Sequence, residues 1–173
     1  MDKLKKLLMV SFLTIFGILV LNTFIYTAEI SAAQTSAINV VYYFEDFEAN
    51  DGGYTHSAIG DGPSSWEWGT PSYTNLAPPA FSLTSAHSGL NAWGTDLDSE
   101  YEDRITQTLT SPLIDVSTIP DHTDVIIEWY QAWHIEENFD LGYTEISLDG
   151  DQWVRVDSFD GQSDGWVAKG VDI

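Results

Sequence analysis

Short runs of β-branched and aromatic residues alternate with clusters of Gly, Pro, Asn, Asp and Ser after residue 37, where helical periodicity is hard to find. This alternation is typical of all-β proteins, because strands favour β-branched and aromatic residues and turns favour the others. The clearest strand is Val125–Trp133, and the turn Asp149-Gly150 predicts a hairpin between Tyr143–Leu148 and Gln152–Val156. Val40–Phe44 and Arg104–Leu109 are further expected strands. We therefore expect an all-β fold, a concanavalin-like β-sandwich or jelly roll.

The first 33 residues have the pattern of a secretory signal peptide. Three lysines precede an almost unbroken apolar run, Leu7–Leu21, and Ser31-Ala32-Ala33 supplies the small residues that a signal peptidase reads. A membrane anchor is the alternative, but the run has about 15 residues, whereas roughly 20 are needed to span a bilayer. We predict cleavage after Ala33, a secreted product, and one domain over residues 34–173.

The chain is strongly acidic, with 6 Lys and Arg against 27 Asp and Glu, a formal net charge of −21. Removal of residues 1–33 takes away three lysines, Asp2 and Glu29, which leaves a net charge of −22. Phosphate contacts need basic side chains, so this composition argues against a nucleic-acid partner. The sequence also holds no cysteine, so disulfides cannot stabilise the domain and a bound metal is one alternative.

Five phrases in the sequence carry a family resemblance. They are Phe44-Glu45-Asp46-Phe47-Glu48, Ser65–Pro71, His87–Thr95, Leu109–Pro112 with Ile114-Asp115, and Gly142–Ser147 running into Asp149-Gly150 and Trp153. In this order and spacing they resemble the MAM-like jelly-roll domain found beside the catalytic domains of secreted bacterial proteases, such as immune inhibitor A metallopeptidases and bacillopeptidase F subtilases. Members of that family usually run on to an Asp-Asp pair that often helps to hold calcium. The sequence stops before such a pair, so we expect a fragment truncated at its C-terminal end.

Catalytic patterns are weak in this sequence. The four histidines, at 56, 87, 122 and 134, do not form the His-Glu-x-x-His spacing of a zinc peptidase. Gly161-Gln162-Ser163-Asp164-Gly165 matches the Gly-x-Ser-x-Gly nucleophile elbow in letters, but no helical pattern and no later histidine follow it, so we interpret it as a polar turn. The carboxylates of Glu45, Asp46 and Glu48 do not have the alternate spacing of a glycosidase strand.

Calcium is the better interpretation of the carboxylates, because Ca²⁺ takes six to eight oxygen ligands, often from several loops. The most favoured ligands are Asp46 and Glu48 on the first expected strand, with Glu136 and Asp140 in the loop before Tyr143. The alternating group Asp96, Asp98, Glu100 and Glu102, which shares one face if the segment is extended, is the second choice. A solvated acidic rim, which only keeps an exported protein soluble, is the alternative.

Trp66, Trp68 and Trp93 lie in segments with a loop-like composition, where binding residues concentrate. Exposed tryptophans there would stack on sugars, although burial in the core is the commoner role of Trp.

These features together predict a non-catalytic extracellular accessory or binding domain, with calcium as a structural ion. Its partner would be a neighbouring catalytic domain or an extracellular protein or polysaccharide surface, with a membrane only if the leader is uncleaved. The alternatives are the flanking part of a secreted protease and an independent carbohydrate-binding module.

Overall fold

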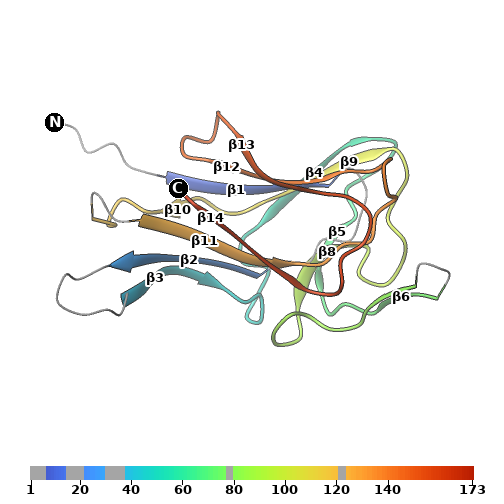
Figure 1. Cartoon of the computed structure of the whole chain (residues 1–173). Coiled ribbons are helices and arrows are strands. Elements are labelled where there is room, and N and C mark those ends of the chain that lie inside the picture. Colours follow the sequence, from blue (N-terminus) through green and yellow to red (C-terminus); the bar gives the residue numbers. More distant parts are fainter. Residues whose placement is uncertain (1–6, 15–21, 30–37, 77–79, 121–123) are drawn as a thin grey trace.

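Every regular element in the described part of the chain is a β-strand (Figure 1). The computed structural model describes residues 7–14, 22–29, 38–76, 80–120 and 124–173. The strands form two larger antiparallel sheets and two small two-stranded ones. The predicted all-β sandwich is confirmed.

The larger sheet has six strands among the described residues, in the order β13-β12-β1-β9-β4, with β10 beside β1. Their bounds are β1 (Leu7–Thr14), β4 (Thr55–Gly60), β9 (Ile105–Thr110), β10 (Ile114–Asp115), β12 (Gly142–Ser147) and β13 (Val154–Phe159). The hairpin β12–β13 is the one that Asp149-Gly150 predicted. Asp149 Oδ1 accepts hydrogen bonds from Asp151 N at 2.9 Å and Gln152 N at 2.8 Å, and Gly150 takes a left-handed φ of 81°.

The second sheet has the order β14-β11-β2-β3. It consists of β2 (Asn22–Glu29), β3 (Ile38–Glu45), β11 (Asp124–Gln131) and β14 (Val167–Asp172). The interior place of β11, paired with β14 and β2, agrees with the prediction that Val125–Trp133 is a central strand.

The two larger sheets lie face to face, as Figure 1 shows, and bury an apolar core between them. Ile127 and Trp129 of β11 are 0% and 1% exposed, while Val10 of β1 and Leu109 of β9 are both 0% exposed. Alternate residues of β9 are buried, which is the period-two pattern of a strand with one face on a core.

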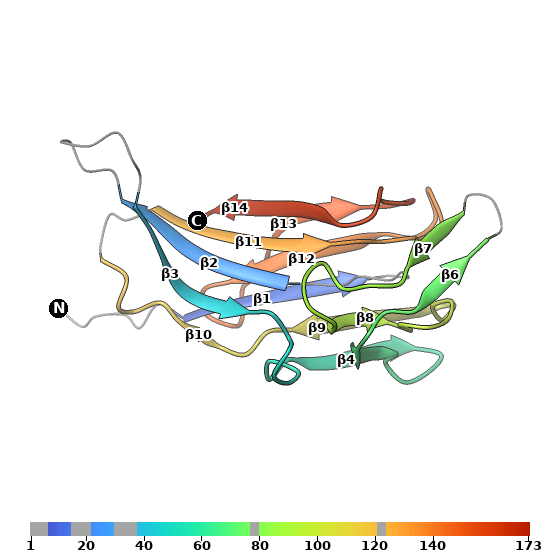
Figure 2. The same cartoon turned by 90° about the horizontal axis from the view of Figure 1, so that it is seen from below.

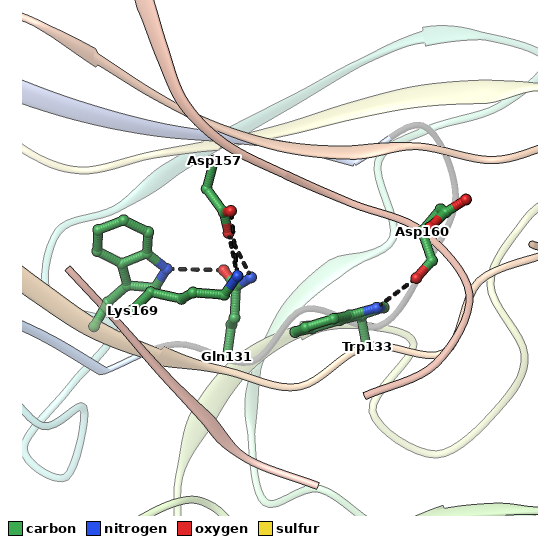
Figure 3. A network of polar contacts seen from close by, with 6 residues as sticks. Gln131, Trp133, Asp157, Asp160 and Lys169 are labelled. Carbon is green, nitrogen blue, oxygen red and sulfur yellow. Dashed lines mark hydrogen bonds and ion pairs between the residues drawn. The ribbon is translucent and has the colours of Figure 1, made fainter. Parts of the chain in front are cut away.

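A polar cluster joins the two sheets beside this core (Figure 3). Lys169 of β14 and Gln131 of β11 both point toward Asp157 of β13. The Lys169 Nζ lies 2.9 Å from Asp157 Oδ2, and Gln131 Nε2 donates to the same oxygen at 3.1 Å. Trp129 Nε1 in turn donates to Gln131 Oε1 at 2.8 Å. Because Asp157 belongs to one sheet and its two donors to the other, the cluster fixes their relative position.

A smaller lobe forms at one end of the sandwich from two short strand pairs. These are β5 (Trp66–Gly69) with β8 (Ala92–Thr95), and β6 (Tyr73–Asn75) with β7 (Phe81–Leu83). They bury a second apolar cluster that includes Tyr73, Phe81, Leu83, Ala92, Leu97 and Ala132. This lobe supplies one wall of the pocket described below.

Strands β1 and β2 lie inside the predicted leader, and the sequence analysis did not anticipate them. Each occupies an interior place, β1 between β12 and β9, and β2 between β11 and β3. The predicted cleavage site, Ser31-Ala32-Ala33, and the lysines before residue 7 lie outside the described residues. Cleavage after Ala33 stays a prediction. It would remove β1 and β2, which this structure places in the interior of the two larger sheets.

The described residues include no helix of the length and apolar character that a membrane crossing requires.

Replacing Trp129 by Ala tests the core directly. We expect a loss of about 3–5 kcal/mol in the free energy of unfolding, because a large side chain that is 1% exposed would leave a cavity. Val154→Ala, at a position that is 61% exposed, is the control and should change stability by less than about 0.5 kcal/mol. Chemical denaturation measures both. A loss below about 1 kcal/mol for Trp129→Ala would place this side chain outside the core.

Candidate acidic pocket

A pocket with a volume of about 750 Å³ is lined in part by residues of β6. Figure 2 shows β6 beside β7 at the end of the molecule away from the C-terminus. Four separate segments line it: β6, the loop before β9, the chain after β11 and the chain after β13. The lining residues are Tyr73, Asn75, Glu100, Tyr101, Asp103, His134, Ile135, Glu136, Glu137, Asp160, Gly161 and Gln162. None of these segments is adjacent to another in the sequence, so the pocket exists only in the folded chain.

Hydrogen bonds to backbone carbonyls hold two of the lining segments against each other. Ile135 N donates to Gly161 O at 2.7 Å, and Trp133 Nε1 donates to Asp160 O at 2.9 Å, as Figure 3 shows. His134 and Gln162 form an antiparallel bridge beside these bonds. The chain after β11 and the chain after β13 therefore form a fixed wall of the pocket.

Aromatic rings form a second wall. The His134 ring stacks on Phe81 with centroids 5.1 Å apart, and Tyr73 lies 6.5 Å from the same imidazole. Burial lowers the pKa of His134, which Glu100 opposes. The imidazole is therefore neutral at neutral pH and does not offset the negative charge of the pocket.

A hydrogen-bonded group of three residues closes the pocket on another side. The Tyr101 hydroxyl donates to Asp140 Oδ2 at 2.8 Å and accepts from Glu136 N at 3.2 Å. Burial, together with the Asp140 carboxyl, raises the pKa of Tyr101. Burial also raises the pKa of Asp140, which is 8% exposed. The phenol thus keeps its proton and orders the turn from Glu136 to Asp140.

Negative charge, with no basic side chain among the lining residues, is the main electrostatic property of the pocket. Five exposed carboxylates line it: Glu100, Asp103, Glu136, Glu137 and Asp160. The basic side chains in the described residues are engaged elsewhere, Arg104 with Asp61, Arg155 with Glu145 and Lys169 with Asp157. Carboxylates lining a concave surface attract cations more strongly than the same charges on a flat one.

Two large apolar side chains stand out on the segments that form the pocket. Phe139, in the same turn as Glu136 and Glu137, is 77% exposed, and Leu76, directly after β6, is 82% exposed. Apolar residues beside a charged pocket are a feature of protein-binding surfaces.

The four residues favoured as calcium ligands do not form one site. Across the described ranges no three His, Asp or Glu side chains come together as a metal-binding group. Glu136 lines the pocket and Asp140 bonds Tyr101, whereas Asp46 Oδ1 accepts from Glu48 N in a local turn. In the described residues these four side chains do not form one group, and their assignment as calcium ligands stays a prediction.

Glu48 has a structural role instead. Its Oε1 accepts hydrogen bonds from Leu90 N at 2.8 Å and Asn91 N at 2.7 Å. Gly89 has a φ of 66°, and a Cβ at this position would collide with the Glu48 carboxylate. The glycine therefore lets the carboxylate reach the turn, and Glu48 joins the segment after β3 to the segment before β8.

The second group of predicted ligands is not extended. Asp96 has a left-handed φ of 52°, and Ser99 N donates to Asp96 O at 3.4 Å across a turn. Asp96, Asp98, Glu100 and Glu102 therefore do not share one strand face, and only Glu100 lines the pocket.

The three tryptophans proposed for sugar stacking lie in strands β5 and β8, not in loops. Trp66 is 3% and Trp93 is 5% exposed, and both belong to the main core cluster. Trp68 is 38% exposed, and its Nε1 donates to Phe47 O at 2.9 Å. Trp66 and Trp93 are thus corrected to core residues, because buried rings offer no face to a ligand.

Ser163 is a structural residue, as its interpretation as part of a polar turn suggested. It is 5% exposed, its Oγ accepts from Trp133 N at 2.9 Å, and β14 rather than a helix follows it. A nucleophile elbow needs an exposed Oγ and a helix after the turn, and neither is present here.

Comparisons with protein-family models, with curated proteins and with solved structures found no match. We therefore infer function from the pocket and from the sequence itself.

Sequence reasoning identified only part of this pocket. It singled out Glu136 and Asp140 because they are acidic and close together, and it considered His134 as one of four histidines that lack the spacing of a zinc peptidase. Tyr73 and Tyr101 carried no signal, because the spacing of single aromatic residues does not show which of them a fold will bring together.

Asp140→Asn tests the buried carboxyl. A raised pKa means that the folded state binds the proton more tightly, so this group destabilises the fold as pH rises above the ordinary Asp value of about 4. Asn is neutral and still offers an acceptor to Tyr101. We expect the variant to melt at a higher temperature than the parent at pH 7, with the difference closing toward pH 3.

The control for Asp140→Asn is Asp124→Asn, which removes the same charge from an exposed position. An equal rise in melting temperature for both variants would mean that the effect comes from general charge repulsion and not from the burial of Asp140. A lower melting temperature for Asp140→Asn at pH 7 would mean that the ionised carboxylate stabilises the fold.

Proposed function

We propose that this chain is a non-catalytic extracellular accessory domain that binds a partner protein through the acidic pocket. The occupant of the pocket is a basic side chain, Lys or Arg, of that partner. The observation that carries this proposal is a pocket of about 750 Å³ lined by five carboxylates and by none of the basic residues in the described part of the chain.

The chemistry of the pocket suits a basic side chain. An Arg guanidinium forms paired hydrogen bonds with carboxylates and stacks on aromatic rings, and the pocket offers both in Glu136 and Glu137 and in the half-buried ring of Tyr101. The neutral His134 adds no repulsion at neutral pH.

Two exposed apolar residues on the segments that form the pocket favour a protein as the source of that side chain. Exposed Phe139 and Leu76 would gain by burial under a partner surface, whereas a small cation would leave them in water.

The family resemblance supports an accessory role beside a catalytic domain. Two of the phrases that carry it, Trp66–Gly69 and Ala92–Thr95, pair as β5 and β8, and Glu48 of a third binds the turn that Gly89 makes. On that basis we propose a MAM-like jelly-roll domain of a secreted protein, with a neighbouring protease domain as the first candidate partner.

Calorimetric titration of the full chain with triarginine tests this proposal, with tricitrulline as the neutral ligand of matched shape. We expect triarginine to bind and tricitrulline not to bind. The double variant Glu100→Gln/Glu137→Gln should weaken triarginine binding about 2- to 30-fold, since each of the two partly exposed ion pairs contributes roughly 0.2–1 kcal/mol.

The matched control is Asp124→Asn/Asp172→Asn, which removes two exposed carboxylates at the far end of β11. It should change the affinity less than twofold. An equal loss in both double variants would assign the binding to the net charge. If Ca²⁺ binds more tightly than triarginine, and Glu100→Gln/Glu137→Gln abolishes that binding, the occupant of the pocket is a calcium ion and not a basic side chain.

A further inference from the structure

The interior places of both sheets are filled by strands that the predicted signal peptidase cleavage would remove. Strand β1 pairs along six residues with β12 and along four with β9, and β2 pairs along seven residues each with β11 and β3. In the described residues, β9 reaches β12, and β3 reaches β11, only through these two strands.

Loss of β1 and β2 would leave four strand edges unpaired inside the sandwich. A row of unpaired N–H and C=O groups on a strand accepts another strand readily, and here the rows belong to strands with buried faces. Leu109 and Ile127, both 0% exposed, lie on two of the strands that would lose this pairing.

We propose that the places of β1 and β2 are strand-acceptor sites, which in the exported protein hold two extended, mainly apolar segments from another polypeptide in antiparallel pairing. The proposal rests on the predicted leader and not on the acidic pocket. It identifies the occupant by its chemistry: about eight residues in β conformation, with an uncharged side chain at each position that faces the core.

The first acceptor site is shaped around the position that Val10 now holds. Val10 is 0% exposed and lies opposite Ile146 in β12. Ser111, which follows β9, forms two hydrogen bonds with the backbone of Val10. Its N donates to Val10 O at 2.9 Å, and its Oγ accepts from Val10 N at 3.0 Å. These bonds recognise any extended backbone, whereas the buried side-chain position selects an apolar residue.

Thr144 indicates that the leader is an imperfect occupant of this site. Its Oγ1 is buried without a hydrogen-bond partner, and it lies opposite position 12 of β1. An occupant with a hydroxyl or amide side chain at that position would lie on the same buried face of the sheet as Thr144 and offer its Oγ1 a hydrogen bond.

The second acceptor site has two large buried apolar side chains of β11 on its core side. Positions 23 and 25 of β2 lie opposite Trp129 and Ile127 of β11, which are 1% and 0% exposed. The same two positions lie opposite Glu45 and Tyr43 of β3 on the other side. An occupant with a charge at either position would bury it against the tryptophan or the isoleucine.

Strand exchange in the full chain tests the proposal. The chain is purified with its leader uncleaved, with a specific protease site placed at the Ala33–Gln34 bond, and is then cut. The probe is a synthetic peptide of residues 5–16, labelled with a fluorophore, and its matched control carries Val10→Asp. Fluorescence anisotropy measures binding and circular dichroism measures folding.

We expect the labelled peptide to displace residues 1–33 and bind the cut protein, and the Val10→Asp peptide to bind at least tenfold more weakly, because a buried, unpaired charge costs more than about 1.4 kcal/mol. If residues 34–173 unfold after cutting, the parent peptide should restore β structure and the control should not. Two results would overturn the proposal: residues 34–173 that keep their melting temperature without any peptide, and equal effects of the two peptides.

Discussion

Backbone pairing through two interior strands is the constraint on which the rest of this structure depends. A buried backbone N–H or C=O must find a partner, and β1 and β2 supply partners to the two strands on either side of each of them. With these in place, β9, β11 and β12 present their buried faces to one another, and Leu109, Trp129 and Ile146 close the core. The cluster of Lys169, Gln131 and Asp157 then fixes one sheet against the other.

The acidic pocket is a consequence of where those strands end. Strand β11 continues into residues 134–137 and β13 into residues 160–162, and the bond from Ile135 N to Gly161 O holds the two extensions together. The lobe built on β6 brings Tyr73 opposite them. Loops that are fixed at their bases by a sandwich can hold several carboxylates around one pocket, because the stability of the core offsets the repulsion between them.

The strands with strong local signals were predictable from the sequence, and the pocket was not. Val125–Trp133 and the Asp149-Gly150 hairpin appear as β11 and β12–β13, because β-branched runs and a turn glycine act locally. Leu7–Thr14 has the same apolar character in a leader and in a buried strand, so composition cannot separate the two. Whether Asp46 and Asp140 lie together depends on long-range geometry, which the spacing of carboxylates does not encode, and the described residues do not bring them into one group.

The most direct test of this account is amide hydrogen exchange on the full chain with its leader uncleaved, read at single residues of β1 and of its neighbours. Interior strands open only with the whole sheet, so exchange at Val10–Leu13 should be as slow as at Leu109 in β9 and Ile146 in β12. Fast exchange throughout residues 7–14, with β9 and β12 still protected, would contradict it, because the sheet would then hold together without the strand on which its pairing depends.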